Sequence, residues 1–262
     1  MRVNFRLLSF CIAFLLLFSL SITAYAEQED AIGWYCKRNS EHKQPLADSR
    51  ISYVEEFSGY YIDHKHGDEA EEKVVYLTFD AGYENGNIER ILDTLKAENV
   101  RGAFFILGNL IKSNTELVVR MASDGHTVCN HTNTHKDMTK VKNEAEFKAE
   151  LESLETLYRE YTGRELAKYY RPPEGRFSRA TMEYASSLGY KTIFWSFAYA
   201  DWDNNSQMSA SAAKKKIMDN IHNGAVILLH PTSKTNADIL CDVIRELKAE
   251  GYRFGTLDEL TK

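Results

Sequence analysis

From Val74 to the C-terminus, short apolar runs alternate with segments whose apolar residues recur at helical spacing, as Ile88, Ile91, Leu92 and Leu95 do. This alternation predicts an α/β fold of seven β/α repeats around a parallel sheet. No glycine-rich nucleotide-binding fingerprint follows the first apolar run. The order of the repeats does not decide whether the sheet closes, and we favour a closed barrel. The strands are expected near residues 74–80, 102–107, 126–130, 169–171, 192–197, 225–229 and 252–254.

Some helix boundaries carry signals of their own. Ser113 with Glu116, and Asn143 with Glu146, have the spacing of a capping box, in which the first side chain and the fourth bond each other's backbone N–H. These pairs predict helices that begin at residues 113 and 143. Ser178 predicts the start of a further helix, which we expect to end near residue 189.

The N-terminus has the pattern of an export signal. Arg2 and Arg6 precede an apolar run, and Ala24 and Ala26 are the small residues that a signal peptidase recognises. We therefore expect residues 1–26 to be removed and the rest of the chain to be exported. An uncleaved membrane anchor is the alternative, although the run is short and interrupted by serines. Without this segment the chain has no expected membrane span.

Residues 27–73 are polar and weakly periodic but contain aromatic residues such as Trp34. A free linker would carry fewer aromatics, so we expect an N-terminal extension packed on a domain of residues 74–262. The whole chain has a formal charge of −6, and removing two arginines with residues 1–26 makes it −8. Such an acidic protein is a poor partner for nucleic acid or for anionic lipid.

Export also bears on the cysteines, which number three after cleavage: Cys36, Cys129 and Cys241. An odd number without a C-x-x-C pair predicts neither a disulfide framework nor a structural zinc site. Cys129 and Cys241 lie among apolar residues and are expected to be ordinary core residues.

Chemically versatile side chains cluster at the ends of the expected strands, where a parallel barrel brings side chains together on one face. Taken singly, each has an ordinary interpretation, such as a turn cap for Asp80 or a surface position for Arg171. Asp203 competes with Asp201 for the same role. The spacing of His131 and His135 places two imidazoles on one side of a helical turn, an arrangement common at divalent metals. The six residues are Asp80, His131, His135, Arg171, Asp201 and His230.

Five segments in this order resemble the motifs of the NodB-type polysaccharide deacetylases, carbohydrate esterase family 4, over about residues 74–260. They are Thr78-Phe79-Asp80, His131-Thr132-Asn133-Thr134-His135, Arg171-Pro172-Pro173-Glu174-Gly175, Asp201-Trp202 and Leu228-Leu229-His230. A closer resemblance is to the N-acetylmuramic acid deacetylases that form muramic δ-lactam in spore cortex. It is carried by Thr78-Phe79-Asp80-Ala81-Gly82-Tyr83-Glu84-Asn85-Gly86, by Gly33-Trp34-Tyr35-Cys36-Lys37-Arg38 and by Gln44-Pro45.

The resemblance implies a distorted (β/α)7 barrel, the NodB homology domain, that hydrolyses an N-acetyl amide on a glycan. His131 and His135 would hold a divalent metal ion, zinc or similar, that polarises the acetyl carbonyl and a water molecule. Asp80 would act as the base and His230 as the acid. The remaining motif residues would orient these two groups or contact the substrate: Arg171 and Asp201 as orienting partners, the backbone N–H of Glu174 as a donor to the oxyanion, and Trp202 and Leu228 at the substrate.

One position departs from the wider family. A second carboxylate, a third metal ligand, usually follows the catalytic acid, whereas this chain has Ala81. Three outcomes remain open: weak metal binding completed by water, substitution by Glu84 or Asn85, or no metal at all. The δ-lactam group also departs from the carboxylate here, so we expect a divalent ion that is weakly bound.

By resemblance, the expected function is an exported peptidoglycan deacetylase of the cell envelope or spore cortex, acting on N-acetylmuramic acid residues of glycan strands. Two alternatives remain. The first is a deacetylase of another acetylated glycan, such as peptidoglycan glucosamine or chitin, or of an acetyl ester. The second is a glycan-binding relative without catalysis, which rests only on Ala81. The sequence does not predict an oligomeric state.

Overall fold

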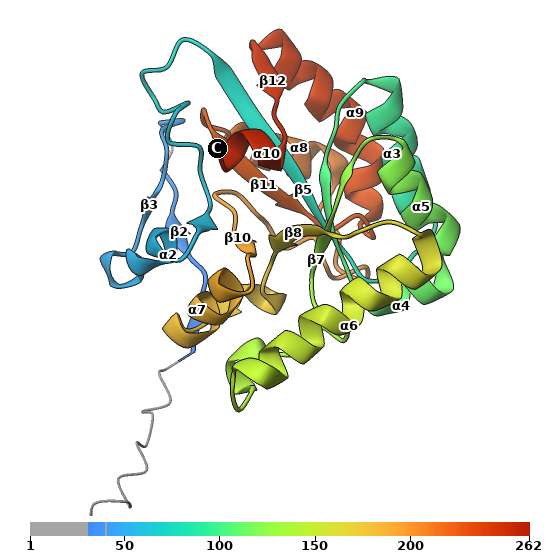
Figure 1. Ribbon diagram of the computed structural model, residues 1–262. Coiled ribbons are helices and arrows are strands. Elements are labelled where there is room, and N and C mark those ends of the chain that lie inside the picture. Colours follow the sequence, from blue (N-terminus) through green and yellow to red (C-terminus); the bar gives the residue numbers. More distant parts are fainter. Residues whose placement is uncertain (1–30, 40) are drawn as a thin grey trace, which may run out of the picture. The chain divides into compact units, whose positions relative to one another are not determined.

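A curled parallel sheet of eight strands forms the centre of the domain (Figure 1). The computed structural model describes residues 31–39 and 41–262, so the expected signal peptide lies outside the described residues. The strands follow the order β11-β5-β6-β7-β8-β10-β4, and β12 pairs with the start of β5. Their bounds are β4 Gly59–Tyr60, β5 Lys73–Ala81, β6 Ala103–Ile106, β7 Thr127–Asn130, β8 Ala167–Tyr170, β10 Lys191–Ile193, β11 Ala225–Leu229 and β12 Tyr252–Phe254.

The sheet closes into a barrel through two different segments between β10 and β11. Near the strand starts, the extension residues 59–63 fill the gap, because Phe194 N–H donates to the Tyr60 carbonyl (2.8 Å) and Asp63 N–H to the Gly224 carbonyl (2.9 Å). Near the strand ends, Leu228 N–H donates to the Phe197 carbonyl (2.9 Å). The distorted (β/α)7 barrel is thus confirmed, with part of its wall supplied from outside the seven repeats.

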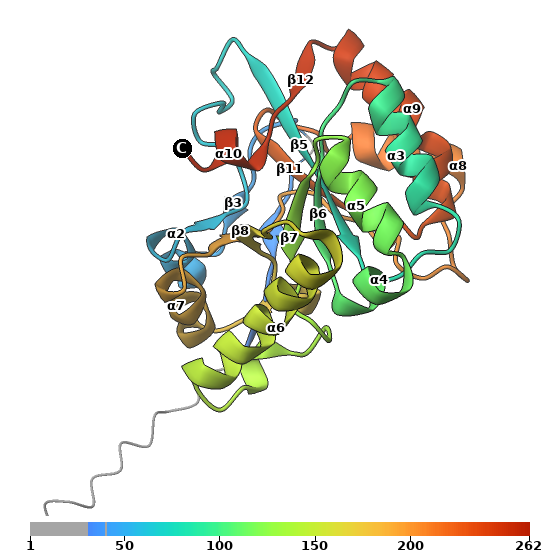
Figure 2. The same cartoon turned by 45° about the vertical axis from the view of Figure 1, so that its right-hand side comes forward.

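Helices cover the outside of the sheet. α3, α5 and α9 lie side by side on one flank, as Figures 1 and 2 both show. α3 buries the predicted face of Ile88, Ile91, Leu92 and Leu95. The longer helices are α3 Ile88–Ala97, α4 Gly108–Ser113, α5 Thr115–Ser123, α6 Glu144–Thr162, α7 Arg179–Ser187, α8 Ala210–Met218 and α9 Lys234–Ala249. The shortest are α2 Tyr53–Glu56 and α10 Leu257–Leu260.

Of the three predicted helix starts, one was wrong, one was half right and one was correct. Ser113 ends α4 instead of capping a helix, since the buried residues Leu110 and Ile111 add a helical turn before it, and α5 begins after Asn114 without a side-chain cap. The Asn143 side chain does accept from the Glu146 N–H, but the Glu146 carboxylate bonds the Lys142 N–H instead. The helix predicted to start at Ser178 is present as α7, and Ser178 caps it in a capping box with Thr181.

The expected strand over residues 192–197 is also shorter than predicted. β10 ends at Ile193, because the chain then leaves its pairing with β8 and turns to bond β11 at Phe197. The change of partner lets this one segment contribute both to the sheet and to its closure.

The extension packs on the domain through a cluster of aromatic and aliphatic side chains. The Trp34 ring stacks on Phe194 with centroids 4.2 Å apart, and its indole N–H donates to the Trp195 carbonyl (2.8 Å). β1 (Ile32–Gly33) pairs with β9 (Arg176–Phe177), and β2 (Cys36–Lys37) with β3 (Leu46–Ala47). Cys36 and Cys129 are buried free thiols, so Cys129 is a core residue as expected, whereas Cys241 is only half-buried. None of the described helices is long and apolar enough to cross a membrane.

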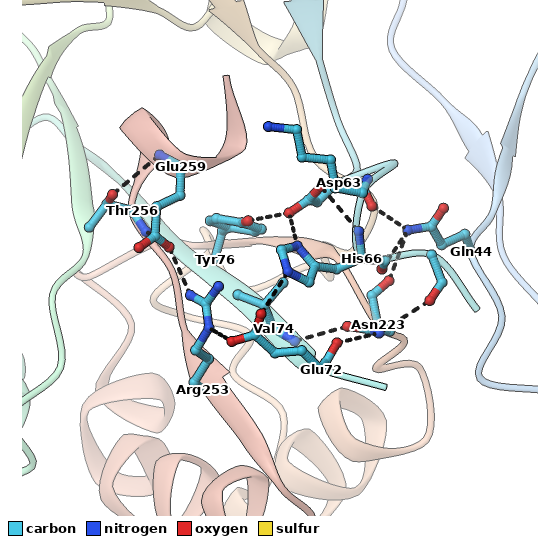
Figure 3. A network of polar contacts seen from close by, with 12 residues as sticks. Gln44, Asp63, His66, Glu72, Val74, Tyr76, Asn223, Arg253, Thr256 and Glu259 are labelled. Carbon is cyan, nitrogen blue, oxygen red and sulfur yellow. Dashed lines mark hydrogen bonds and ion pairs between the residues drawn. The ribbon is translucent and has the colours of Figure 1, made fainter. Parts of the chain in front are cut away.

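A polar network anchors the extension at the strand starts, opposite the strand ends (Figure 3). The buried Asp63 carboxylate accepts from the Tyr76 hydroxyl and lies 2.6 Å from His66 Nδ1. His66 Nε2 lies 3.0 Å from Glu72, which also pairs with Arg253 of β12. A histidine between two carboxylates is stabilised in its charged form. Burial alone would lower the pKa of His66, but its bonds to Asp63 and Glu72 outweigh burial and raise it.

We predict that this network makes stability depend on pH. Because the pKa of His66 is raised by folding, its contribution is complete below the unfolded pKa of about 6.5 and is lost as pH rises through the folded pKa. His66→Asn should lower the free energy of unfolding by on the order of 1–3 kcal/mol in mild acid and by less at alkaline pH. Urea unfolding of both proteins at several pH values measures the difference.

The matched control is His64→Asn, two residues away, because His64 is exposed and its ion-pair partner Glu55 is exposed as well. A His66→Asn deficit that stays constant across this pH range would show that the histidine does not act through its charge.

Candidate active site

The motif side chains meet at the carboxyl ends of the strands. Asp80 lies in β5, and His131, Arg171 and His230 directly follow β7, β8 and β11. Two adjoining cavities of about 610 and 320 Å³ lie at this end, and each is lined by Asp80, His131, His135, Trp202 and His230. These residues therefore face one groove, although they are far apart in sequence.

Arg171 fixes the position of Asp80. Its guanidinium is fully buried, and Nη1 donates to Asp80 Oδ1 (2.8 Å). Nη2 donates to the Thr78 hydroxyl (2.8 Å), and Nε to the Ile193 carbonyl (2.9 Å). Burial alone would raise the pKa of Asp80, but the charge of Arg171, with smaller effects of the nearby histidines, lowers it below its ordinary value. Asp80 is therefore a carboxylate at neutral pH that faces the groove.

His131 and His135 are neighbours, but not on a helix as the spacing suggested. They lie in a loop in which Thr132 and His135 have φ of +72° and +59°, in the left-handed region. The Thr132 hydroxyl accepts from the His135 N–H (2.9 Å), and the two imidazole centroids are 5.0 Å apart. The reversal of the backbone therefore brings the two rings together without a helical turn.

The tautomer of His131 follows from its hydrogen bond. Its Nδ1 lies 2.8 Å from the Arg171 carbonyl, which can only accept, so Nδ1 carries the hydrogen. The lone pair is then on Nε2, which lies 3.5 Å from Asp80 Oδ2. Burial, only partly offset by the Asp80 charge, lowers the pKa of His131 to about 4, so the ring is neutral at neutral pH. A neutral imidazole oriented through its other nitrogen is the usual state of a metal ligand.

These two imidazoles fit a divalent ion, but with few protein ligands. In the described part of the chain, no group of three histidine, cysteine, aspartate or glutamate side chains is placed to hold a metal. Both Glu84 oxygens bond backbone N–H groups at the start of α3, and Asn85 donates to the Thr232 carbonyl (2.8 Å). The two candidates for a third ligand thus have other partners, and water would complete the coordination.

His230 has a different electrostatic setting. Its Nδ1 lies 2.7 Å from Asp201 Oδ1, and its backbone N–H donates to Asp201 Oδ2 (2.8 Å). Asn236 of α9 donates to the same carboxylate (2.6 Å). Burial would lower the pKa of His230, but Asp201, and to a lesser degree Asp80, raise it above its ordinary value. Asp203, the competing carboxylate, is exposed and accepts from the Asn205 N–H.

The three residues expected at the substrate lie around the larger cavity. Glu174 has φ of +56° in the short turn Pro173–Gly175, and the Gly175 carbonyl accepts from the Trp34 N–H (2.8 Å). Trp202 is 60% exposed, and Leu228 is buried. All three border the 610 Å³ cavity.

The sequence did not single out several residues of the groove. Trp195 and Tyr199 line the larger cavity and Tyr83 the smaller one, while Asn236 holds Asp201. Tyr83 was detectable, because an aromatic residue follows the catalytic motif by only a few positions. Asn236 was not, because an asparagine in the first turn of a helix is ordinary.

Three comparisons with known proteins agree with this geometry. The pattern of the family described as "Polysaccharide deacetylase" matches residues 67–193. The chain is 37% identical to the peptidoglycan-N-acetylmuramic acid deacetylase PdaA of Bacillus subtilis over 96% of this chain and 94% of that one. The structure of that protein, described as a family 4 carbohydrate esterase, superposes with a TM-score of 0.82, covering 88% of this chain and 97% of the other.

Two more distant relatives differ in function. The peptidoglycan-N-acetylglucosamine deacetylase PgdA of Listeria monocytogenes is 33% identical over 72% of this chain but only 39% of its own length. A Bacillus anthracis protein described as a pseudoenzyme of the same esterase family is 27% identical, with a TM-score of 0.69 over 78% of this chain and 69% of the other.

We predict that Asp201 sets the protonation of His230. In Asp201→Asn the pKa of His230 should fall, because burial then opposes the charged ring with much less compensation. A histidine NMR titration measures this pKa directly. Asp203→Asn is the matched control and should leave it unchanged. An unshifted His230 titration in Asp201→Asn would show that another group keeps the ring charged.

Proposed function

We propose that this chain, which belongs to the polysaccharide deacetylase family, carbohydrate esterase family 4, is an exported peptidoglycan N-deacetylase acting on N-acetylmuramic acid. Members of this family hydrolyse amide bonds on glycans. One observation carries the proposal: a carboxylate and an imidazole with oppositely tuned environments, Asp80 and His230, border both cavities of the groove. The export-signal pattern of residues 1–26 and the extracytoplasmic location of peptidoglycan support export.

The two side chains are suited to opposite halves of an amide hydrolysis. Asp80 is ionised and can accept a proton from the attacking water. His230 has a raised pKa and keeps Nδ1 toward Asp201, so Nε2 can present a proton to the departing amine. Arg171 and Asp201 orient these two groups. The backbone N–H of Glu174, in its constrained turn, would be a donor to the oxyanion.

Deacetylases of this family depend in general on a metal ion. In this chain His131 and His135 would hold it, and when bound it supplies Lewis-acid polarisation of the acetyl group and of water. Ala81 offers no ligand, so we expect the ion, zinc or similar, to be weakly held.

The muramic acid substrate is supported by the extent of the similarity. PdaA matches this chain nearly end to end, including the N-terminal extension, whereas PgdA matches only 72% of it. Once its acetyl group is removed, a muramic acid without a peptide has a free amine near its own lactyl carboxyl. Condensation of the amine with the carboxyl group, which forms the C–N bond, breaks the carboxyl C–O bond and releases water, would give the muramic δ-lactam of spore cortex.

Acetate release from peptide-free glycan strands tests the proposed function. The protein should release acetate, and Asp80→Asn should abolish release. Because this variant leaves the buried Arg171 guanidinium without its carboxylate, its urea unfolding midpoint should fall, and circular dichroism should show that it is still folded under the assay conditions. His230→Ala should lower kcat about a hundredfold or more. Asp203→Asn is the matched control for Asp80→Asn and should retain activity.

Each result has a distinct meaning. Wild-type rates in Asp80→Asn would show that another group is the base. Acetate release only from chitin oligomers or from N-acetylglucosamine residues would show that muramic acid is not the substrate. No release from any acetylated glycan, with metal supplied, would favour a glycan-binding protein without catalysis.

Metal removal is predicted to be easy and reversible. Because the described residues offer two imidazoles as protein ligands and no group of three, brief treatment with a chelator should abolish acetate release, and added Zn²⁺ or another divalent ion should restore it. Activity assays before and after add-back measure this, with His131→Ala as a variant that added metal should not rescue. Unchanged turnover in excess chelator would remove the metal from the mechanism.

A further inference from the structure

Some of the exposed aromatic side chains line the groove of the candidate active site. Among the described residues, five large hydrophobic side chains are exposed, and two of them, Tyr83 (46%) and Trp202 (60%), border the groove. The other three are Tyr35, Leu46 and Tyr161, none of which lines either cavity. Two exposed aromatic rings that line one groove, Tyr83 and Trp202, are typical of a ligand-binding surface.

Tyr83 lines one of the two cavities of the groove and not the other. It lines the 320 Å³ cavity with Leu107 and Thr232, whereas Trp195 and Tyr199 line the 610 Å³ cavity. The residues shared by both cavities include Asp80, so the reacting centre lies between two compartments. Small-molecule sites commonly measure about 300–1,000 Å³, which makes each compartment large enough for a ligand group of its own.

The Tyr83 ring is hydrogen-bonded to the loop that carries Trp202. Asn204 Nδ2 donates to the Tyr83 hydroxyl (2.7 Å), and Asn204 lies two residues after Trp202. Gln207 steadies the same loop by donating to the Asp201 carbonyl (3.0 Å) and the Asp203 carbonyl (2.7 Å). A ring fixed before binding loses little conformational freedom when a ligand stacks on it.

We propose that Tyr83 forms a binding surface for the sugar next to the one that is deacetylated, which makes an oligosaccharide the preferred substrate. This inference rests on the proposed function of the same site. The flat ring of Tyr83 packs against the apolar face of a pyranose, while Trp202 borders both compartments and contacts the reacting sugar. The hydrogen bond from Asn204 to the Tyr83 hydroxyl holds the Tyr83 ring near the loop that carries Trp202.

Substrates of different length test the proposal. For the wild type, kcat/KM for acetate release should rise from an acetylated monosaccharide to peptide-free glycan oligosaccharides. Tyr83→Ala should flatten this rise, with a loss of about tenfold on the oligosaccharides that appears mainly in KM. Tyr83→Phe, which keeps the ring and loses the hydroxyl, should lose less than Tyr83→Ala.

The matched control is Tyr161→Ala, because Tyr161 is equally exposed (46%) but lies in α6 and lines neither cavity. It should behave as the wild type on every substrate. Equal kcat/KM values for Tyr83→Ala and Tyr161→Ala on long substrates would overturn the proposed surface, as would a Tyr83→Ala loss that is the same for the monosaccharide and the oligosaccharides.

A binding measurement separates this inference from the proposed function. Calorimetric titration of Asp80→Asn with peptide-free oligosaccharides should show tighter binding of longer chains, and the added Tyr83→Ala change should remove that gain. If the wild type releases no acetate but longer oligosaccharides still bind more tightly, the proposed deacetylase function is wrong and the Tyr83 binding surface is supported. If acetate is released but binding does not depend on Tyr83, the Tyr83 binding surface is wrong and the proposed deacetylase function is supported.

Discussion

The buried Arg171 guanidinium organises both the sheet and the site. A charge without solvent is costly unless it is paired and hydrogen-bonded, and Arg171 satisfies this condition through Asp80, the Thr78 hydroxyl and the carbonyls of β10 and its following residue. It also lies over the Phe105 ring, 4.1 Å from the centroid. These contacts link β5, β6 and β10 to the end of β8. The same residue lowers the pKa of Asp80 and, through its carbonyl, orients His131.

The N-terminal extension contributes directly to the catalytic end of the barrel. Trp34 bonds the Gly175 and Trp195 carbonyls, and so connects the turn that carries Glu174 to the wall of the larger cavity. A Cβ on Gly175 would lie 2.7 Å from the Trp195 ring and 3.1 Å from Trp34, so only glycine fits this junction. The extension also fills the gap in the sheet at residues 59–63. Barrel closure and groove shape therefore depend on the same segment.

Much of the fold and of the site could be predicted from the sequence, because periodicity and strand ends are local properties. Apolar spacing located the strands and the buried face of α3, and ordered motifs placed Asp80, Arg171 and His230 at strand ends. The left-handed loop between His131 and His135 could not be predicted, since the same spacing fits a helical turn. The early end of β10 was missed because it depends on pairing with β11, far along the chain.

By itself, the sequence determined that this chain forms a parallel α/β sheet with versatile side chains at its strand ends, because hydrophobic periodicity and motif order are local properties of the chain. Only the tertiary structure decided that Glu84 and Asn85 have partners away from a metal, that Asn236 holds Asp201, and that Tyr83 faces the groove. These outcomes depend on which distant residues meet when the barrel closes, and no local pattern encodes such contacts.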